Sequence, residues 1–127
     1  MRVFETKKYA MGYIYVGAQV KRTKYGCFKI GETARSIEVR EGEIQKTETS
    51  YKMLGYIAIP HATKPMLLAV EALVRLKLSF CKKYGYIKND HFLYDVINQK
   101  QDLQDITNTV LDIARKACDW LEFEYIG

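Results

Sequence analysis

Two segments with strand composition flank a basic turn near the N-terminus, and they limit the possible folds more than any other feature of the chain. Residues 12–18, GYIYVGA, and residues 26–31, GCFKIG, are dominated by β-branched and aromatic side chains, which favour strands. The segment between them, QVKRTKY, is polar. The pattern therefore predicts a β-hairpin whose tip carries Lys21, Arg22 and Lys24.

Helices and strands alternate in the rest of the chain. The spacing of apolar residues predicts a helix over residues 36–48, a strand over 52–60, a long helix over 64–82 and an amphipathic helix over 102–118. Residues 91–97, HFLYDVI, are compatible with either a short strand or a helical turn. The order β-β-α-β-α-α predicts an α+β fold, in which helices flank a small antiparallel three-stranded sheet.

One domain accounts for the whole chain, residues 1–127. A chain of this length with 48% hydrophobic residues can bury a core. No linker or repeat interrupts the sequence. We expect residues 100–127 to add a C-terminal helix and a tail to the domain. The tail, WLEFEYI, alternates in a way that predicts an extended segment packing Trp120.

Cysteine usage and hydropathy indicate the cellular compartment. Cys27, Cys81 and Cys118 are odd in number and far apart, which argues against a disulfide framework or a structural zinc site and suits a reducing cytosol. No apolar run approaches the roughly 20 residues of a membrane-spanning helix, and the N-terminus lacks the apolar core of a signal peptide. We expect a cytoplasmic protein, in the host cytoplasm if it is viral, with no membrane partner.

Charge is spread unevenly along the chain. The net charge is +5, but residues 1–40 hold nine basic and three acidic side chains, a net of +6, whereas residues 101–127 hold two basic and six acidic, a net of −4. A basic end of this kind suits a polyanion such as DNA. Ordinary surface charge, which keeps a protein soluble, explains the total equally well.

A carboxylate interrupts the apolar stripe of the long helix. Glu71 lies one turn after Leu67 and just before Val74, where an acidic side chain is costly without a cation, a metal or a hydrogen-bond partner. Two interpretations are open. Glu71 can form an i,i+4 ion pair with Arg75, or it can hold a hard cation such as Mg²⁺, which often binds one or two carboxylates together with substrate phosphate.

Four further residues become candidates only in combination. Tyr13 and Tyr15 share a strand face, because side chains repeat every second residue. Lys29 lies inside an otherwise apolar strand, and Arg40 lies on the helix expected over residues 36–48. Considered one at a time, each is adequately explained as a packing or surface residue.

Taken together and in this order, these residues resemble the GIY-YIG nuclease superfamily. Residues 13–15, YIY, stand where the family has GIY, and residues 29–31, KIG, stand where it has YIG, which reads KIG in the phage- and virus-type branch. Residues 32–33, ET, follow as in the family's G-x-T pattern. Arg40 stands at the position of the helix-borne arginine, and Glu71 stands at that of the metal-binding glutamate.

The resemblance spans about residues 11–96 and includes three departures. Tyr13 replaces the first glycine of GIY, although Gly12 is adjacent. Lys29 replaces the tyrosine of YIG, as is normal in the branch with KIG, and this removes one candidate base. Arg75 stands one helical turn after the glutamate, where that branch often has histidine.

The resemblance implies a metal-dependent endonuclease that hydrolyses DNA phosphodiester bonds with one Mg²⁺ or Mn²⁺ on Glu71. We expect Tyr15 to act as the general base, with Lys29, Arg40 and the metal favouring its phenolate form. We expect Arg40 also to clamp the scissile phosphate with its planar fork. Auxiliary roles are expected for Tyr13 and His91, and DNA-binding roles for Lys21, Arg22, Lys24 and Arg35.

Two other functions are open for the same sequence. A catalytically inactive nucleic-acid-binding module would bind DNA with a steep salt dependence and without cleavage. A protein-interaction module would turn its acidic C-terminal helix toward a partner. Many members of the superfamily are dimers, so a homodimer is open as well. The complete set of Tyr15, Lys29, Arg40 and Glu71 favours the enzyme.

Overall fold

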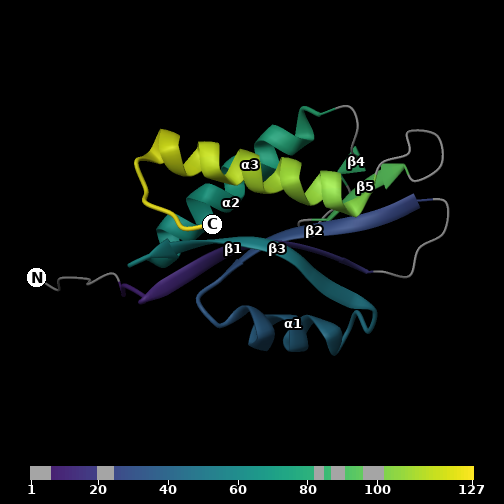
Figure 1. Ribbon diagram of the computed structural model, residues 1–127, viewed down its shortest axis with the longest axis horizontal. Helices are drawn as coiled ribbons and strands as arrows, with labels where there is room; N and C mark the ends of the chain where they lie inside the picture. Colours follow the sequence, from purple (N-terminus) through teal and green to yellow (C-terminus); the bar gives the residue numbers. More distant parts are fainter. Residues whose placement is uncertain (1–6, 20–24, 82–84, 87–90, 96–101) are drawn as a thin grey trace, which may run out of the picture.

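A five-stranded antiparallel sheet carries helices on both faces in the computed structural model, which describes residues 7–19, 25–81, 85–86, 91–95 and 102–127. The elements are β1 (Met11–Gln19), β2 (Tyr25–Thr33), α1 (Ile37–Gln45), β3 (Tyr51–Pro60), α2 (Lys64–Ser79), β4 (Gly85–Tyr86), β5 (His91–Asp95) and α3 (Leu103–Leu121). The strands lie in the order β3-β1-β2-β5-β4. α2 and α3 cover one face of the sheet, and α1 lies on the other (Figure 1).

The expected α+β class and the order of its main elements are confirmed. The three expected strands form the β3-β1-β2 part of the sheet, and β5 and β4 extend it beyond β2. Of the two conformations compatible with HFLYDVI, residues 91–95 adopt the strand, because they pair with β2. The hairpin tip with Lys21, Arg22 and Lys24 lies outside the described residues.

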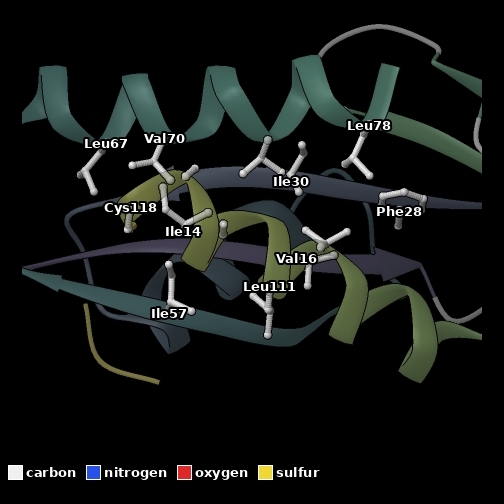
Figure 2. Packing of buried hydrophobic residues seen from close by; sticks show 14 of the residues in the cluster. Ile14, Val16, Phe28, Ile30, Ile57, Leu67, Val70, Leu78, Leu111 and Cys118 are labelled. Atoms are coloured by element: carbon white, nitrogen blue, oxygen red, sulfur yellow. The ribbon is translucent and has the colours of Figure 1, made fainter. Parts of the chain in front are cut away.

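β1 is buried on both sides because helices cover both faces of the sheet. Ile14 and Val16 point toward α2 and α3 and belong to the main hydrophobic core (Figure 2). Tyr15 points the opposite way and packs with Ile44 of α1 and Tyr51 of β3 in a smaller cluster. The period-2 alternation of a strand thus places Tyr15 on the face that α1 covers.

α2 begins where the sequence predicts a helix start. The Thr63 hydroxyl accepts a hydrogen bond from the backbone N–H of Met66 at 3.3 Å, and Pro65 lies in the first turn, where it loses no helical hydrogen bond. Glu71 is part of the buried face of this helix, as its place in the apolar stripe predicts. That face consists of Leu67, Val70, Glu71, Val74 and Leu78.

The C-terminal segment differs from the expectation for Trp120. α3 continues to Leu121, so Trp120 lies on a helix rather than in an extended tail, and it is 75% exposed. The prediction that Trp120 is packed is wrong, because the helical period turns the neighbouring residues Ala117 and Cys118 to the core and leaves position 120 outside. Only the end of the tail is extended: Ile126 and Ala58 of β3 exchange two backbone hydrogen bonds.

Two further observations concern the chain as a whole. Cys27, Cys81 and Cys118 are all free thiols. Among the residues that the structure describes, none of the helices has both the length and the apolar character required to cross a membrane.

Candidate active site

Tyr15 lies at the centre of the candidate site and is 1% exposed. Its cross-strand partner on β2 is Gly31. A Cβ atom added at Gly31 would lie 2.3 Å from the Tyr15 hydroxyl oxygen and 2.5 Å from its Cζ, which is far inside van der Waals contact. Only glycine therefore leaves room for the phenol, and this gives the glycine of the KIG segment a physical role.

α1 brings Arg40 to the phenol. The helix starts at a Ser36 cap, whose hydroxyl accepts a hydrogen bond from the Val39 backbone N–H at 3.3 Å. One turn later, Arg40 donates from Nε to the Tyr15 hydroxyl at 3.3 Å. Its Nη1 lies 3.5 Å from Oε1 of Glu43. The guanidinium is therefore anchored between the phenol and a carboxylate of its own helix.

α2 brings Glu71 to the same place, although α2 covers the opposite face of the sheet. Glu71 is 7% exposed, and its Oε1 lies 3.4 Å from Nη2 of Arg75. β5 pairs with β2 from Tyr25 to Lys29, and in the described part of the chain no strand pairs with residues 30–33 on that side. Side chains from the two faces of the sheet can meet at this open edge.

A pocket of about 290 Å³ lies where these elements meet. It is lined by the four residues predicted to be catalytic, which are Tyr15 of β1, Lys29 of β2, Arg40 of α1 and Glu71 of α2. Leu68 lines it as well. The position of Glu71 is compatible with both interpretations, the ion pair and the cation ligand. Its carboxylate pairs with Arg75 and also lines the pocket that holds the Tyr15 phenol. The polar lining consists of Tyr15, Lys29, Gly31, Glu32, Arg40 and Glu71.

The electrostatic surroundings raise the pKa of Tyr15 above its ordinary value. Burial of the phenol is the largest cause. The hydrogen bond and the positive charge of Arg40 lower the pKa, as expected, but the carboxylates of Glu71 and Glu32 raise it further. The effect of Arg40 thus has the expected direction, and burial outweighs it.

Glu32 is a pocket residue that the sequence reasoning missed. Its side chain is 9% exposed, and its Oε1 forms an ion pair with Nζ of Lys64, the first residue of α2. Its other oxygen, Oε2, is buried without a hydrogen-bond partner. The available signal was its position directly after the KIG segment, at the end of a strand that is otherwise mostly apolar.

A second, polar pocket of about 700 Å³ adjoins the first and shares Glu32 and Arg40 with it. Arg35, predicted to bind DNA, lines this second pocket and forms an ion pair with Glu43 of α1. The other basic residues that line the second pocket are Lys7, Arg40 and Lys64.

The two residues expected to be auxiliary, Tyr13 and His91, occupy different places. Tyr13 shares a face with Tyr15, as predicted, but its ring packs edge-on against that of Tyr56, with centroids 5.6 Å apart, and it does not line the pocket of Tyr15. His91 pairs with Lys29 in the strand register of β5 and β2. Its backbone therefore lies beside a pocket residue.

The donor set of the pocket is compatible with a hard divalent cation. Within the described residues, no group of three or more His, Cys, Asp or Glu side chains is placed to hold a metal. Two carboxylates, Glu71 and Glu32, line the pocket, and one oxygen of Glu32 has no hydrogen-bond partner. Mg²⁺ is commonly held by one or two carboxylates, with water and substrate phosphate completing its shell.

Comparisons with known proteins identify one relationship. A family model described as the T5orf172 domain matches residues 12–118, which include nearly all of the sheet, every residue that lines the pocket of Tyr15 and most of α3. No curated protein and no solved structure matches the chain.

Proposed function

The chain belongs to the T5orf172 domain family, a phage-derived domain related to nuclease folds of the GIY-YIG kind, and from this premise we propose that it is a metal-dependent endonuclease acting on DNA. One observation carries the proposal. Tyr15, Lys29, Arg40 and Glu71 come from four different elements, and all four line one pocket. Packing alone does not require a phenol, an ammonium, a guanidinium and a carboxylate to share a cavity.

Tyr15, in its phenolate form, is the group that takes the proton from the attacking water and becomes the neutral phenol. A phenol is a weak base at neutral pH, and burial in this pocket opposes its ionisation. The hydrogen bond from Arg40 Nε favours the phenolate. Glu71, with its carboxylate in the pocket, would hold Mg²⁺ or Mn²⁺, and such an ion supplies positive charge beside the phenol and the scissile phosphate.

Arg40 and Lys29 bind the phosphate. The guanidinium has five N–H donors, and its contacts with Tyr15 and Glu43 use Nε and Nη1. The remaining donors form the planar fork that suits two phosphate oxygens. Lys29, half-buried on β2, adds a point charge to the same pocket.

The adjoining polar pocket extends the phosphate-binding surface. Lys7, Arg35 and Lys64 line it, and Arg40 joins it to the pocket of Tyr15. A row of basic groups that leads to a reactive centre suits the backbone of a DNA strand, which offers one phosphate per nucleotide. Contacts of this kind position the strand without reading its sequence.

Cleavage of supercoiled plasmid with Mg²⁺ tests the proposal. We expect the wild type to nick the plasmid and Tyr15→Phe to be slower by about 100-fold or more, the usual effect of losing a general base. We expect Glu71→Gln to be at least as slow, because the carboxylate that would hold the metal is lost. Tyr13→Phe is the matched control, because Tyr13 lies on the same strand face but outside the pocket. Equal rates in all four proteins would reject the proposal, and thermal unfolding shows whether each variant is folded.

Two observations favour a second function, a DNA-binding module without turnover. The Glu71 carboxylate already has a cationic partner in Arg75, and the pKa of Tyr15 is raised rather than lowered. Such a module would bind duplex DNA with an affinity that falls steeply with salt. It would leave the plasmid intact with Mg²⁺, Mn²⁺ or any other divalent ion.

A further inference from the structure

Only one of the two carboxylate oxygens of Glu32 has a partner among the described residues. Its side chain is 9% exposed, Oε1 pairs with Lys64 Nζ, and Oε2 is buried with no hydrogen-bond partner in the described part of the chain. A buried polar atom without a partner carries the full cost of leaving water, and the cost is larger for a charged group. Lys64 therefore accounts for only one of the two oxygens, and a partner for the other is lacking.

The strand register aims Glu32 at the side of the sheet from which Glu71 comes. Glu32 pairs with Ile14, a core residue that faces α2, whereas its neighbour Gly31 pairs with Tyr15 on the other face. Glu32 and Glu71 both line the pocket, and both act electrostatically on the Tyr15 phenol. Two acidic side chains from β2 and α2 thus converge on one small cavity.

We infer that Glu32 is a second protein ligand of the divalent cation that Glu71 holds, an inference that rests on the proposed metal-dependent function. Two carboxylates, one of them with an unsatisfied oxygen, form the kind of donor set that Mg²⁺ and Mn²⁺ take together with water and phosphate. A divalent ion would also neutralise two like charges that otherwise share a pocket. Neither charge then requires a nearby cationic side chain.

Lys64 has the properties of a counterion that competes with the metal. Its side chain is 56% exposed, and it reaches Glu32 from the first residue of α2. A lysine ammonium is a mobile point charge on a flexible stem, which can leave a carboxylate without disturbing the fold. Glu32 therefore has a cationic partner on Oε1 when no metal is bound, and the positive charge of that partner opposes a cation at Oε2.

Binding of Mn²⁺ to the DNA-free protein, measured by electron paramagnetic resonance of the free ion, tests the inference without any cleavage assay. We expect Glu32→Gln to weaken binding by about tenfold or more. We expect Lys64→Met to tighten it by up to about fivefold, because the nearby positive charge that opposes the ion is removed, and the effect of an exposed charge is small. Asp112→Asn and Lys116→Met are matched controls, since they make the same charge changes in an ion pair on α3, outside the pocket.

The outcomes separate this inference from the proposed function. If Glu71→Gln abolishes Mn²⁺ binding while Glu32→Gln and Lys64→Met bind like the wild type, the second ligand is refuted and the proposed function stands. If the two control variants shift binding as much as Glu32→Gln and Lys64→Met do, the effect is one of net charge, and the inference is also refuted. A wild type that binds no Mn²⁺ overturns both.

Discussion

Replacing Gly31 by alanine tests the contact on which the position of Tyr15 depends. The new Cβ would lie 2.3 Å from the Tyr15 hydroxyl and 2.5 Å from its Cζ, so the buried phenol must move away. Overpacking of this kind costs about 1–3 kcal/mol, and loss of the hydrogen bond from Arg40 adds about 1 kcal/mol. We therefore expect Gly31→Ala to lower the free energy of unfolding by about 2–4 kcal/mol.

The same substitution elsewhere in the chain provides a control with the opposite sign. A Cβ added at Gly42 in α1 meets nothing within 4 Å. Gly42→Ala should therefore stabilise the protein by about 0.5–1 kcal/mol through helix propensity. For a domain of this size, about 4 °C of melting temperature corresponds to 1 kcal/mol, so differential scanning calorimetry separates the two variants by roughly 10 °C or more.

A double variant makes this test specific to Tyr15. Tyr15→Phe removes the hydroxyl oxygen, which is the atom nearest to the new Cβ. Gly31→Ala combined with Tyr15→Phe should cost less than the sum of the two single changes, by an amount within the roughly 0.5–3 kcal/mol found for residues in contact. Additive costs, or a Gly31→Ala variant as stable as the wild type, would show that the phenol does not rest on this glycine.

Two further predictions concern a titration and an exposed ring. Because the pKa of Tyr15 is raised, above about pH 10 the unfolded chain loses a phenolic proton that the folded protein keeps. The free energy of unfolding should therefore fall as pH rises in this range. In urea titrations Tyr15→Phe should make this fall less steep, and an unchanged pH dependence would refute the prediction. Trp120 is the single tryptophan and is 75% exposed, so its fluorescence should be red-shifted and fully quenched by acrylamide, and Trp120→Ala should change stability by less than about 0.5 kcal/mol. A blue-shifted, protected emission would place the ring in a packed environment instead.

The residues that sequence alone located are those whose positions follow from local periodicity. Tyr15 follows from strand alternation, and Glu71 follows from the helical stripe in which it is the acidic member. Arg40 and Lys29 have no such local signal, and they became candidates only through the resemblance to the GIY-YIG superfamily. That resemblance predicted a shared site, and the pocket contains all four residues.

Residues whose roles depend on pairing between distant segments could not be located in this way. The close approach of Gly31 and Tyr15 depends on the register of β1 and β2, and a slip of one residue would exchange the two faces. The same register turns Glu32 toward α2. Strand β5 was ambiguous because a short apolar segment has no period of its own, and only its pairing with β2 makes it a strand.

The pocket is divided between two stretches of chain that leave the ribosome at different times. Tyr15, Lys29 and Arg40 belong to the hairpin and to α1, whereas Glu71 arrives only with α2, whose apolar face must dock on the sheet to be buried. Because N-terminal segments emerge first, the nascent chain holds the phenol, the guanidinium and the Glu32 carboxylate before it holds Glu71. The pocket can therefore be complete only after α2 has been synthesised and has docked on the sheet.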